Sequence, residues 1–517
     1  MILDQNNLEE AVDQAHGWEG MEGRSEAAVD NDVELLTEAL HARRRGDFAT
    51  AEARFMEVYD RDRNNPWPLI EMAQVEFLRS DFRSVRQYLE QVEALAEIDE
   101  ETWDALATAW LNCLSPLECL RVAQRAQELF AGDDRFFSHR LKALERLNRV
   151  EEAAGLIDGA GEIPPPDRIS AAKILRRAGR LEEGLQLLAG NRSAGALVEK
   201  ARILDRAGKS RLAVESLSEA KRQLAAHPET QYNRTLEPKI REQQARERGI
   251  ASAEEILKWT AALKAEKPLP LAFLIGHPRS GTTLLESLIE RLGGAAIASE
   301  FPILENEKIK WVQDLATRDT TISPLLKDEG LAALRGSYWQ QLTHVAAARE
   351  GQLVIDKNPG LTDGVQWIAK YFPEAKILTA LRDPRDVVVS CMFQDFGFSR
   401  LGVACLSWEG AAHTWADTMT HWVEMRGHLP DDRWLEVRYE DLVRDPDAIV
   451  GEVLTFLGLS RLEEPTAPDR LIRTPSYPDA TSPVHTKAVQ RWRAYERWLN
   501  PLRPIIEPVM KRLGYDW

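Results

Sequence analysis

The sequence predicts an α/β protein preceded by an all-α helical-repeat part. The first observation is a helical pattern of apolar residues that runs from Asn31 to about Thr235 and recurs as helix-turn-helix units. The second is a series of short apolar segments between Leu271 and Arg438, each followed by polar residues and separated by helical segments. Strands that alternate with helices predict an open, mainly parallel sheet with flanking helices.

Length and composition limit the classes of function that this protein can have. The chain has 517 residues, 29% of them charged, and a formal net charge of -17, which argues against a general nucleic-acid-binding surface. We find no secretory signal and no apolar run of about 20 residues that could span a membrane. The four cysteines, Cys113, Cys119, Cys391 and Cys405, show no CxxC and no metal-ligand spacing, which predicts free thiols in a reducing compartment. Together these features predict a soluble cytoplasmic protein.

The first 235 residues are expected to form a tail and a set of repeats. Residues 1–30 are polar and acidic and predict a flexible tail. In residues 31–235 the clearest repeated pair is centred on Gly46 and Ser80, which lie 34 positions apart. Later copies follow at spacings of 31 and 29, so those repeats are trimmed. The region resembles the tetratricopeptide (TPR) family, whose solenoids commonly hold peptides or other proteins. The alternative is a solenoid that only packs on its neighbour.

A connecting segment separates the repeats from the sheet. Residues 236–267 are rich in Lys, Glu, Arg and Ala and predict a connecting helix. Lys267-Pro268-Leu269-Pro270 ends this helix and begins the α/β domain, which we place at residues 268–517.

The α/β domain opens with a strand, a glycine turn and a helix. The apolar run Leu271–Ile275 predicts a buried strand, and an amphipathic helix that stops at Gly293-Gly294 follows the turn 276–283. Such a turn aims backbone N–H groups and a helix dipole at one point. The turn also carries the guanidinium of Arg279, a glycine (Gly281) that lets an anion approach the backbone closely, and the hydroxyl donors Ser280, Thr282 and Thr283. This loop is expected to bind a phosphate-like group, although an ordinary tight turn is the alternative.

The loop is not that of a nucleoside triphosphatase. In GxxxxGK[ST] a lysine reaches the phosphates, whereas Thr282 occupies that position in this chain. The sequence PRSGTT resembles the 5′-phosphosulfate loop of sulfotransferases that use 3′-phosphoadenosine-5′-phosphosulfate (PAPS). This resemblance implies a P-loop-type fold, with Arg279 and the backbone from Ser280 to Thr283 on the 5′-phosphosulfate. It also implies PAPS as donor, 3′-phosphoadenosine 5′-phosphate (PAP) as product, and no metal.

A second anion site is predicted after the strand Lys376–Leu381. Arg382 ends this strand and Ser390 lies eight residues later in the following helix, so both side chains can reach one anion. RDPRDVVVS resembles the sulfotransferase signature for the 3′-phosphate. The alternative is that Arg382 merely pairs with Asp383 or Asp386.

Two further strand ends carry candidate catalytic groups. Glu300 follows the short strand around Ile297, and its position resembles that of the catalytic glutamate of protein-tyrosine sulfotransferases, which implies a general base. Glu305 and Glu307 are nearby competitors. Lys357 follows the strand predicted at 352–355 and resembles the family lysine that stabilises the leaving phosphate. The alternative there is a Walker B strand with a magnesium-binding aspartate.

The C-terminal block 481–498 combines four cations with two tryptophans. It resembles the segment of bacterial and tyrosylprotein sulfotransferases that closes over the donor. The resemblance implies that Ser482 stabilises the transition state and that Arg497, or Arg493 in another alignment, contacts phosphate. Tyr439 resembles the family tyrosine beside the adenosine, with a core tyrosine as the alternative.

Together these patterns predict a PAPS-dependent sulfotransferase of class EC 2.8.2. We expect in-line displacement with a glutamate base, and protein tyrosine as the first candidate acceptor, before a carbohydrate or a small hydroxylated metabolite. The repeats would hold the peptide or protein, and a homodimer is allowed but not required. The rival hypotheses are a P-loop kinase or NTPase, and a TPR binding scaffold whose transferase domain is inactive.

Overall fold

The computed structural model describes residues 26–79, 81–95, 98–130, 134–248, 254, 256, 258, 268–301, 303–304, 328–464 and 484–517. The chain divides into two compact units, Met1–Ile174 and Leu175–Trp517. Their boundary falls inside helix α10 (Arg168–Arg177).

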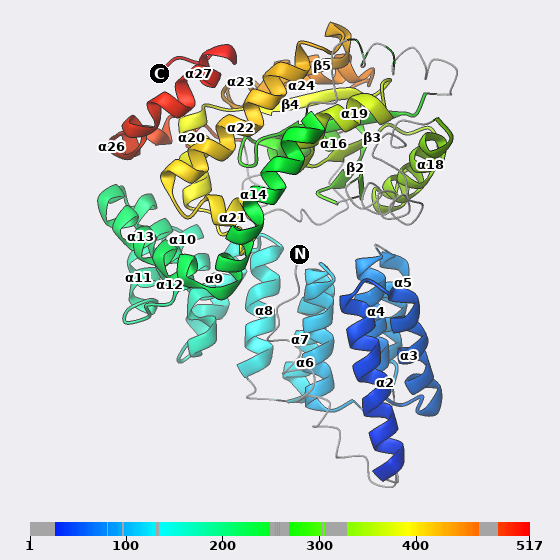
Figure 1. Ribbon diagram of the computed structural model, residues 1–517. Helices are drawn as coiled ribbons and strands as arrows, with labels where there is room; N and C mark the ends of the chain where they lie inside the picture. The colour runs from blue at the N-terminus through cyan, green and yellow to red at the C-terminus, as the bar shows by residue number, and fades with distance from the viewer. Residues whose placement is uncertain are drawn as a thin grey trace. The chain divides into compact units, whose positions relative to one another are not determined.

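The described part of the first unit is helical, and each helix packs on its neighbour in the chain (Figure 1). Its helices are α2 (Glu26–Arg44), α3 (Phe48–Arg61), α4 (Trp67–Leu78), α5 (Phe82–Glu93), α6 (Glu100–Asn112), α7 (Pro116–Leu129), α8 (Asp134–Arg146), α9 (Val150–Gly159) and the 3-10 turn η2 (Pro165–Asp167). The predicted helical character of this region is therefore confirmed, and its arrangement fits a repeat solenoid.

The capping residues of this unit show the predicted repeat. Asp47 caps α3 and Asp81 caps α5, and these two aspartates lie 34 positions apart. Asp47 accepts the Thr50 N–H, and Asp81 accepts the N–H groups of Arg83 and Ser84, which otherwise have no partner within the helix. Gly46 precedes the first cap with φ +77°, a left-handed conformation that suits glycine. Its predicted equivalent, Ser80, lies outside the described residues.

The second unit begins with helices that lie mostly in the region that the sequence assigned to the repeats. These are α11 (Leu181–Leu187), α12 (Ala194–Arg206), α13 (Ser210–Ala226) and α14 (Pro228–Arg248), whose later residues fall in the predicted connecting helix 236–267. They join the α/β part through side-chain contacts: Glu237 of α14 pairs with Arg400 at 3.1 Å, and Asn233 Nδ2 donates to the Phe398 carbonyl at 2.7 Å. The compact unit thus begins earlier than the predicted domain 268–517, whose limits stay a prediction.

A five-stranded sheet forms the centre of this unit. The strands are β1 (Leu271–Gly276), β2 (Ala296–Ser299), β3 (Val354–Lys357), β4 (Lys376–Leu381) and β5 (Trp434–Arg438). Their order is β2-β3-β1-β4-β5 and every pair is parallel, which confirms the predicted α/β class. Strand β3 lies later than the predicted 352–355, because Asp356 and Lys357 pair in register with Phe273 and Leu274 of β1.

Helices cover both faces of the sheet. On one face α16 (Thr282–Gly293) and α24 (Pro446–Leu457) pack on alternate strand residues such as Leu274, Ile355 and Val437. On the other face Phe273 packs with Tyr338 of α18 (Asp328–Val345) and with Phe372. The remaining elements are η5 (Pro359–Gly364), α19 (Val365–Tyr371), α20 (Pro384–Met392), α21 (Arg400–Ala404), α22 (Trp408–Arg426), η6 (Asp431–Arg433), α23 (Tyr439–Arg444), η7 (Arg491–Tyr495), α26 (Glu496–Leu499), η8 (Asn500–Leu502) and α27 (Arg503–Arg512).

The strand order places the chemistry-bearing loops side by side. The chain builds β2 and β3 on one side of β1 and then crosses to β4 and β5 on the other. In such sheets ligands collect where the strand order reverses, outside the carboxyl ends of the strands. The segments after β1, β3 and β4 therefore share one edge.

A glycine permits the close packing of the two central strands. Gly276 ends β1 with φ +137°, and a Cβ built there would lie 2.5 Å from the carbonyl oxygen of Ala380 in β4. Any side chain at this position would push the two backbones apart.

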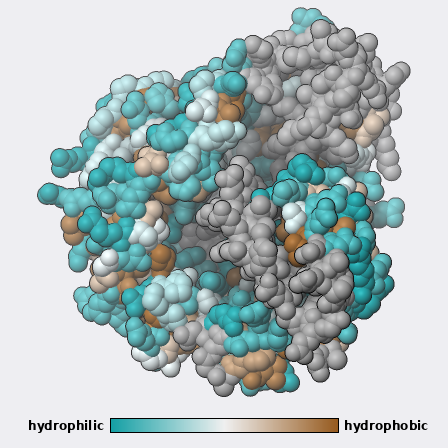
Figure 2. Space-filling model, turned by 60° about the horizontal axis from the view of Figure 1, so that its bottom comes forward, coloured by the Kyte–Doolittle hydropathy of each residue, from teal (hydrophilic) through white to brown (hydrophobic). Residues whose placement is uncertain are grey.

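One face of the molecule is mostly polar where its residues are described. Figure 2 shows one face, on which hydrophilic residues predominate among those coloured and hydrophobic residues form small separate patches. Within the described ranges, no helix combines the length and the apolar composition that crossing a membrane requires.

Two histidines are buried in the second unit and held neutral. Burial lowers the pKa of His277, in the loop after β1, to about 4. Its Nδ1 lies 2.8 Å from the Pro278 carbonyl, which accepts the ring hydrogen. Burial likewise lowers the pKa of His421 to about 3, and this ring contacts Gln366 Oε1 at 2.7 Å. Both rings must acquire charge when the unit unfolds in acid.

We predict opposite effects for two glycine-to-alanine changes. Gly276→Ala should destabilise the second unit by about 3 kcal/mol or more, because the new Cβ meets a backbone oxygen. The matched change Gly451→Ala in α24 meets nothing within 4 Å and should stabilise by up to about 1 kcal/mol through helix propensity. Urea unfolding followed by tryptophan fluorescence measures both. Equal effects would contradict the close approach of β1 and β4.

We predict that His277 makes the second unit sensitive to acid. Its folded pKa lies below the ordinary value, so its contribution is complete above about pH 6.5 and is lost as the pH falls toward 4. At pH 5 the loss is about 2 kcal/mol of the free energy of unfolding. His277→Asn should lose less stability than the wild type between pH 7.5 and pH 5, whereas the exposed His413→Asn should follow the wild type.

Candidate active site

The loop after β1 forms a cradle that depends on two unusual backbone positions. Gly281 has φ +93°, and a Cβ there would lie 2.5 Å from the Tyr439 ring, so only glycine allows this close approach. Arg279 also lies in the left-handed region, at φ +73°, which is uncommon for a residue with a side chain. The Ser280 N–H donates to the His277 carbonyl at 3.1 Å and tightens the turn. The resulting geometry aims the start of α16 at the sheet edge.

The two predicted anion-binding motifs contact each other directly. Arg279 Nε donates to Ser390 Oγ at 3.0 Å, although 111 positions separate them in the chain. Arg382 Nη1 donates to the Arg279 carbonyl at 3.2 Å, and its guanidinium lies 4.6 Å from the centre of the Tyr439 ring. The motifs therefore form one site.

A hollow of about 130 Å³ opens at this site. Its lining is Arg279, Gly281, Thr282, Thr283, Leu284, Arg382, Ser390, Tyr439, Val484, His485, Ala488 and Arg491. Three guanidinium groups and several hydroxyls in so small a space suit a multiply charged anion. Arg382 Nε is buried and has no hydrogen-bond partner within the described part of the chain, which leaves one donor for such a ligand. Small-molecule pockets usually enclose about 300–1,000 Å³, so this hollow would enclose only part of a nucleotide.

The C-terminal block contributes a different arginine from the two predicted. Arg493 and Arg497 are exposed and do not line the hollow, whereas Arg491 does. Arg491 is the first residue of the short helix η7, and this turn directs neighbouring side chains in different directions. Ser482 lies outside the described residues. Ser280 is buried in the loop and is not part of the lining.

A buried lysine between two carboxylates lies at the same sheet edge. Lys357 is fully buried, and its Nζ lies 2.7 Å from Glu300 Oε1 and 3.0 Å from Glu286 Oε2. The Glu300 N–H also donates to the Lys357 carbonyl at 2.7 Å. Glu300 has φ +58°, a left-handed conformation held by these contacts. Its side chain is 36% exposed, so one carboxylate of the three-residue group is open to a ligand.

Glu286 is a site residue that sequence reasoning missed. It lies in α16 and is fully buried against Lys357. The available signal was an acidic residue between the apolar positions Leu285 and Leu288, but glutamate in an amphipathic helix is usually a solvated residue. Only the position of Lys357 in β3 shows why a carboxylate belongs there.

The geometry weighs against a magnesium site at the end of β3. Successive residues of a strand point to opposite faces of the sheet. Lys357 contacts Glu286 of α16, whereas Asp356 accepts a hydrogen bond from Tyr338 of α18 at 2.8 Å. Asp356 is therefore on the face away from the cradle helix.

Residues 270–464 match the sulfotransferase family model. Protein-tyrosine sulfotransferase 1 of Danio rerio is 25% identical over 270 residues, which cover 48% of this chain and 73% of that protein. An uncharacterized protein of Aquifex aeolicus is 30% identical over 256 residues, 47% of this chain but only 33% of that protein. The solved sulfotransferase domain of the Synechococcus PCC 7002 olefin synthase aligns with 49% of this chain and 98% of its own, at 22% identity and a TM-score of 0.36.

The match to the family covers the sheet, the cradle and the Lys357 group, and leaves the N-terminal helices outside it. This chain spans about a third of the length of the Aquifex relative. The strand-cradle-helix segment, the arginines at the edge of the parallel sheet and the family match lie in the same stretch of sequence. Residues 270–464 thus form a domain of the sulfotransferase family.

Proposed function

We propose that the second unit binds PAPS and transfers its sulfuryl group to an acceptor hydroxyl. The observation that supports this most strongly is the direct contact of Arg279 with Ser390 and Arg382, which joins two anion-binding motifs in one hollow. A donor with phosphate at the 3′ position and phosphosulfate at the 5′ position needs two such groups of cations. The family of the domain supports a transferase.

In this proposal the donor is held at both ends. Arg279 and the N–H groups from Ser280 to Thr283 bind the 5′-phosphosulfate, where the start of α16 adds its dipole. Arg382 and Ser390 bind the 3′-phosphate. The ring of Tyr439, which packs against the Arg382 guanidinium, lies beside the adenosine.

Glu300 and Lys357 carry the transfer. Glu300 accepts the proton of the acceptor hydroxyl while that oxygen forms a bond to sulfur. The bond between sulfur and the bridging oxygen of the 5′-phosphate breaks, and Lys357 donates a hydrogen bond to that oxygen as its charge grows. The products are the sulfate ester and PAP, and the displacement needs no redox partner. Ser482 is proposed to support the same charge.

Glu286 explains how Lys357 can serve two partners. A buried ammonium needs a nearby negative charge at every stage, because an unpaired charge in the interior costs several kcal/mol. When Lys357 Nζ turns from Glu300 toward the leaving oxygen, Glu286 at 3.0 Å keeps it paired. Glu300 is then free to act as the base.

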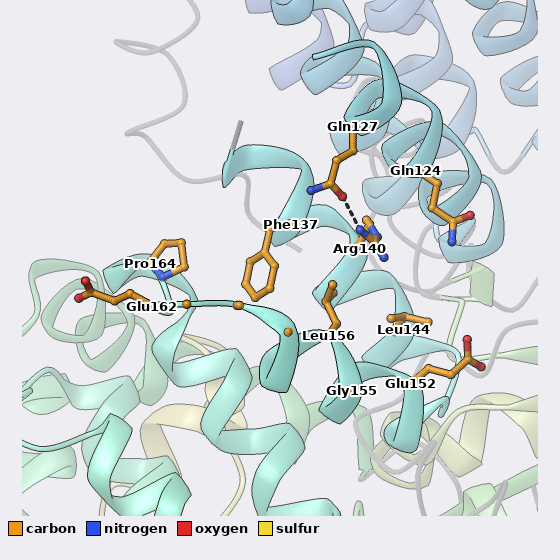
Figure 3. Close-up of a pocket in the computed structure, with 13 residues that line it drawn as sticks. Gln124, Gln127, Phe137, Arg140, Leu144, Glu152, Gly155, Leu156, Glu162 and Pro164 are labelled. Atoms are coloured by element: carbon orange, nitrogen blue, oxygen red, sulfur yellow. Dashed lines mark hydrogen bonds between the residues drawn. The ribbon is translucent and has the colours of Figure 1, made fainter. Parts of the chain in front are cut away.

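A protein tyrosine is the proposed acceptor. The Danio rerio relative is named a protein-tyrosine sulfotransferase, which supports this choice over a carbohydrate or a small metabolite. The helical unit offers a place for a peptide: a hollow of about 680 Å³ between α7, α8 and α9. Figure 3 shows Phe137 and Leu156 at this hollow, with the hydrogen bond from Arg140 to Gln127 beside them. Apolar and amide groups in one hollow suit peptide side chains and backbone.

The cellular setting in this proposal is a reducing compartment such as the cytoplasm. All four cysteines are free and buried. Burial raises the pKa of Cys113 and of Cys119 to about 12, which makes both thiols unreactive.

The rival hypotheses predict different behaviour. A P-loop kinase needs a lysine at the position of Thr282. It also needs a magnesium ligand on the face of the sheet where the cradle helix α16 lies, whereas Asp356 points to the opposite face. An inactive scaffold has no use for a buried lysine held between two carboxylates beside an arginine-lined hollow. Both features favour an active sulfotransferase.

We predict that the protein binds PAP more tightly than Mg-ATP. Isothermal titration should give at least a tenfold preference for PAP. Arg382→Gln should lower PAP affinity about tenfold to a hundredfold and 5′-AMP affinity much less, because it removes a charged hydrogen bond to the 3′-phosphate. Arg444→Gln, a 72% exposed arginine in α23, is the matched control and should change neither. Tighter binding of Mg-ATP would favour the kinase.

We predict that Glu300→Gln lowers kcat for sulfuryl transfer by about 10²–10⁴, because the general base is lost. PAP affinity should stay within about twofold. Labelled PAPS and a tyrosine-containing peptide library measure the transfer, and the exposed Glu424→Gln in α22 serves as the control. Full activity in Glu300→Gln would remove this residue from the mechanism.

A further inference from the structure

Helix α12, in the part of the chain that the sequence assigned to the repeats, contacts the segment that closes the hollow. Asp205 near the end of α12 accepts from Arg491 Nη2 at 2.9 Å and from Nε at 3.4 Å. The two residues are 286 positions apart and belong to the same compact unit. Both side chains are about three quarters buried, which strengthens their attraction relative to a fully solvated pair.

The backbone of Arg491 is fixed from the other side. Asp386 of α20 accepts the N–H groups of Gln490 at 2.8 Å and of Trp492 at 2.7 Å. Gln490 takes a left-handed conformation, φ +59°, to make this turn. The sheet part of the unit therefore holds the main chain at this point, and α12 holds the side chain.

Neighbouring side chains restrain the Arg491 guanidinium. It stacks on Phe393, 4.8 Å from the ring centre, and Tyr495 donates its hydroxyl hydrogen to Asp205. Tyr495 is fully buried, so it fixes the carboxylate in turn. Asp205 engages Nε and Nη2, and Arg491 at the same time lines the hollow together with Arg279 and Arg382.

We propose that Asp205 is a positioning residue that holds Arg491 as the third cation for the 3′-phosphate of the donor. This inference rests on the proposed function and extends it, because a helix outside the matched residues 270–464 then completes the donor site. An arginine fixed in advance loses less side-chain entropy on binding than a free one. The carboxylate also offsets the repulsion among three arginines that share one small hollow.

The test compares PAP with 5′-AMP, which lacks the 3′-phosphate. Isothermal titration should show that Arg491→Met weakens PAP binding about tenfold to a hundredfold and AMP binding less than threefold. Asp205→Asn should weaken PAP binding about threefold to tenfold and again spare AMP, which a purely structural role would not do. The matched control is Glu237→Gln, which breaks the Glu237–Arg400 pair of the same unit away from the hollow. It should leave both affinities unchanged.

A double variant separates the outcomes. If Asp205 acts through Arg491, then Asp205→Asn has no further effect in the Arg491→Met background. Equal losses for PAP and AMP, or a loss in Glu237→Gln as large as in Asp205→Asn, would refute the positioning role. If the wild-type protein binds PAP and both Asp205→Asn and Arg491→Met bind it equally well, this inference is refuted but the proposed function is not. Wild-type protein that binds no PAP refutes the proposed function as well.

Discussion

The Arg382 guanidinium joins the segments on which the site depends. It donates to the carbonyl of Arg279 in the loop after β1 and to the carbonyl of Ala488 in the C-terminal block, and it covers the ring of Tyr439 after β5. Arg382 itself follows β4. One planar, permanently charged side chain with five donors can satisfy so many neighbours at once, which a lysine could not. Its contacts connect the segments that follow β1, β4 and β5 with the C-terminal block at the edge of the hollow.

Beside this hollow, buried charge and unusual backbone conformations lie together. Lys357 has no exposed surface and pairs with both Glu286 and Glu300. Glu300 and Arg279 both adopt positive φ angles, which cost free energy and persist only where surrounding contacts hold them. The pairing of β3 with β1 and the close approach at Gly281 supply those contacts. The contacts that stabilise the sheet therefore also fix the positions of these charged groups.

The boundary between repeats and transferase is less sharp than the sequence pattern indicates. The helices from α11 to α14 continue the helical pattern, yet they form one compact unit with the sheet. Contacts such as Arg202 Nε to the Phe393 carbonyl at 2.9 Å tie them to the helices that follow β4. Helix α12 therefore contacts the segment that lines the hollow, through the pair Asp205–Arg491.

The sequence by itself determined the fold class and predicted much of the lining of the hollow: the glycine turn after an apolar strand, the arginine after β4 and the serine eight residues later are local patterns that can be read without the tertiary structure. It also placed Lys357 and Glu300 at strand ends of a parallel sheet, which meet at one edge, whereas their catalytic roles rest on the resemblance to sulfotransferases and stay a proposal. Only the tertiary structure decided that Glu286 faces Lys357, that Arg491 rather than Arg493 or Arg497 lines the hollow, and that Asp205 pairs with Arg491. The direction of a side chain on a helix or a short turn depends on packing between distant segments, and no local pattern encodes that packing.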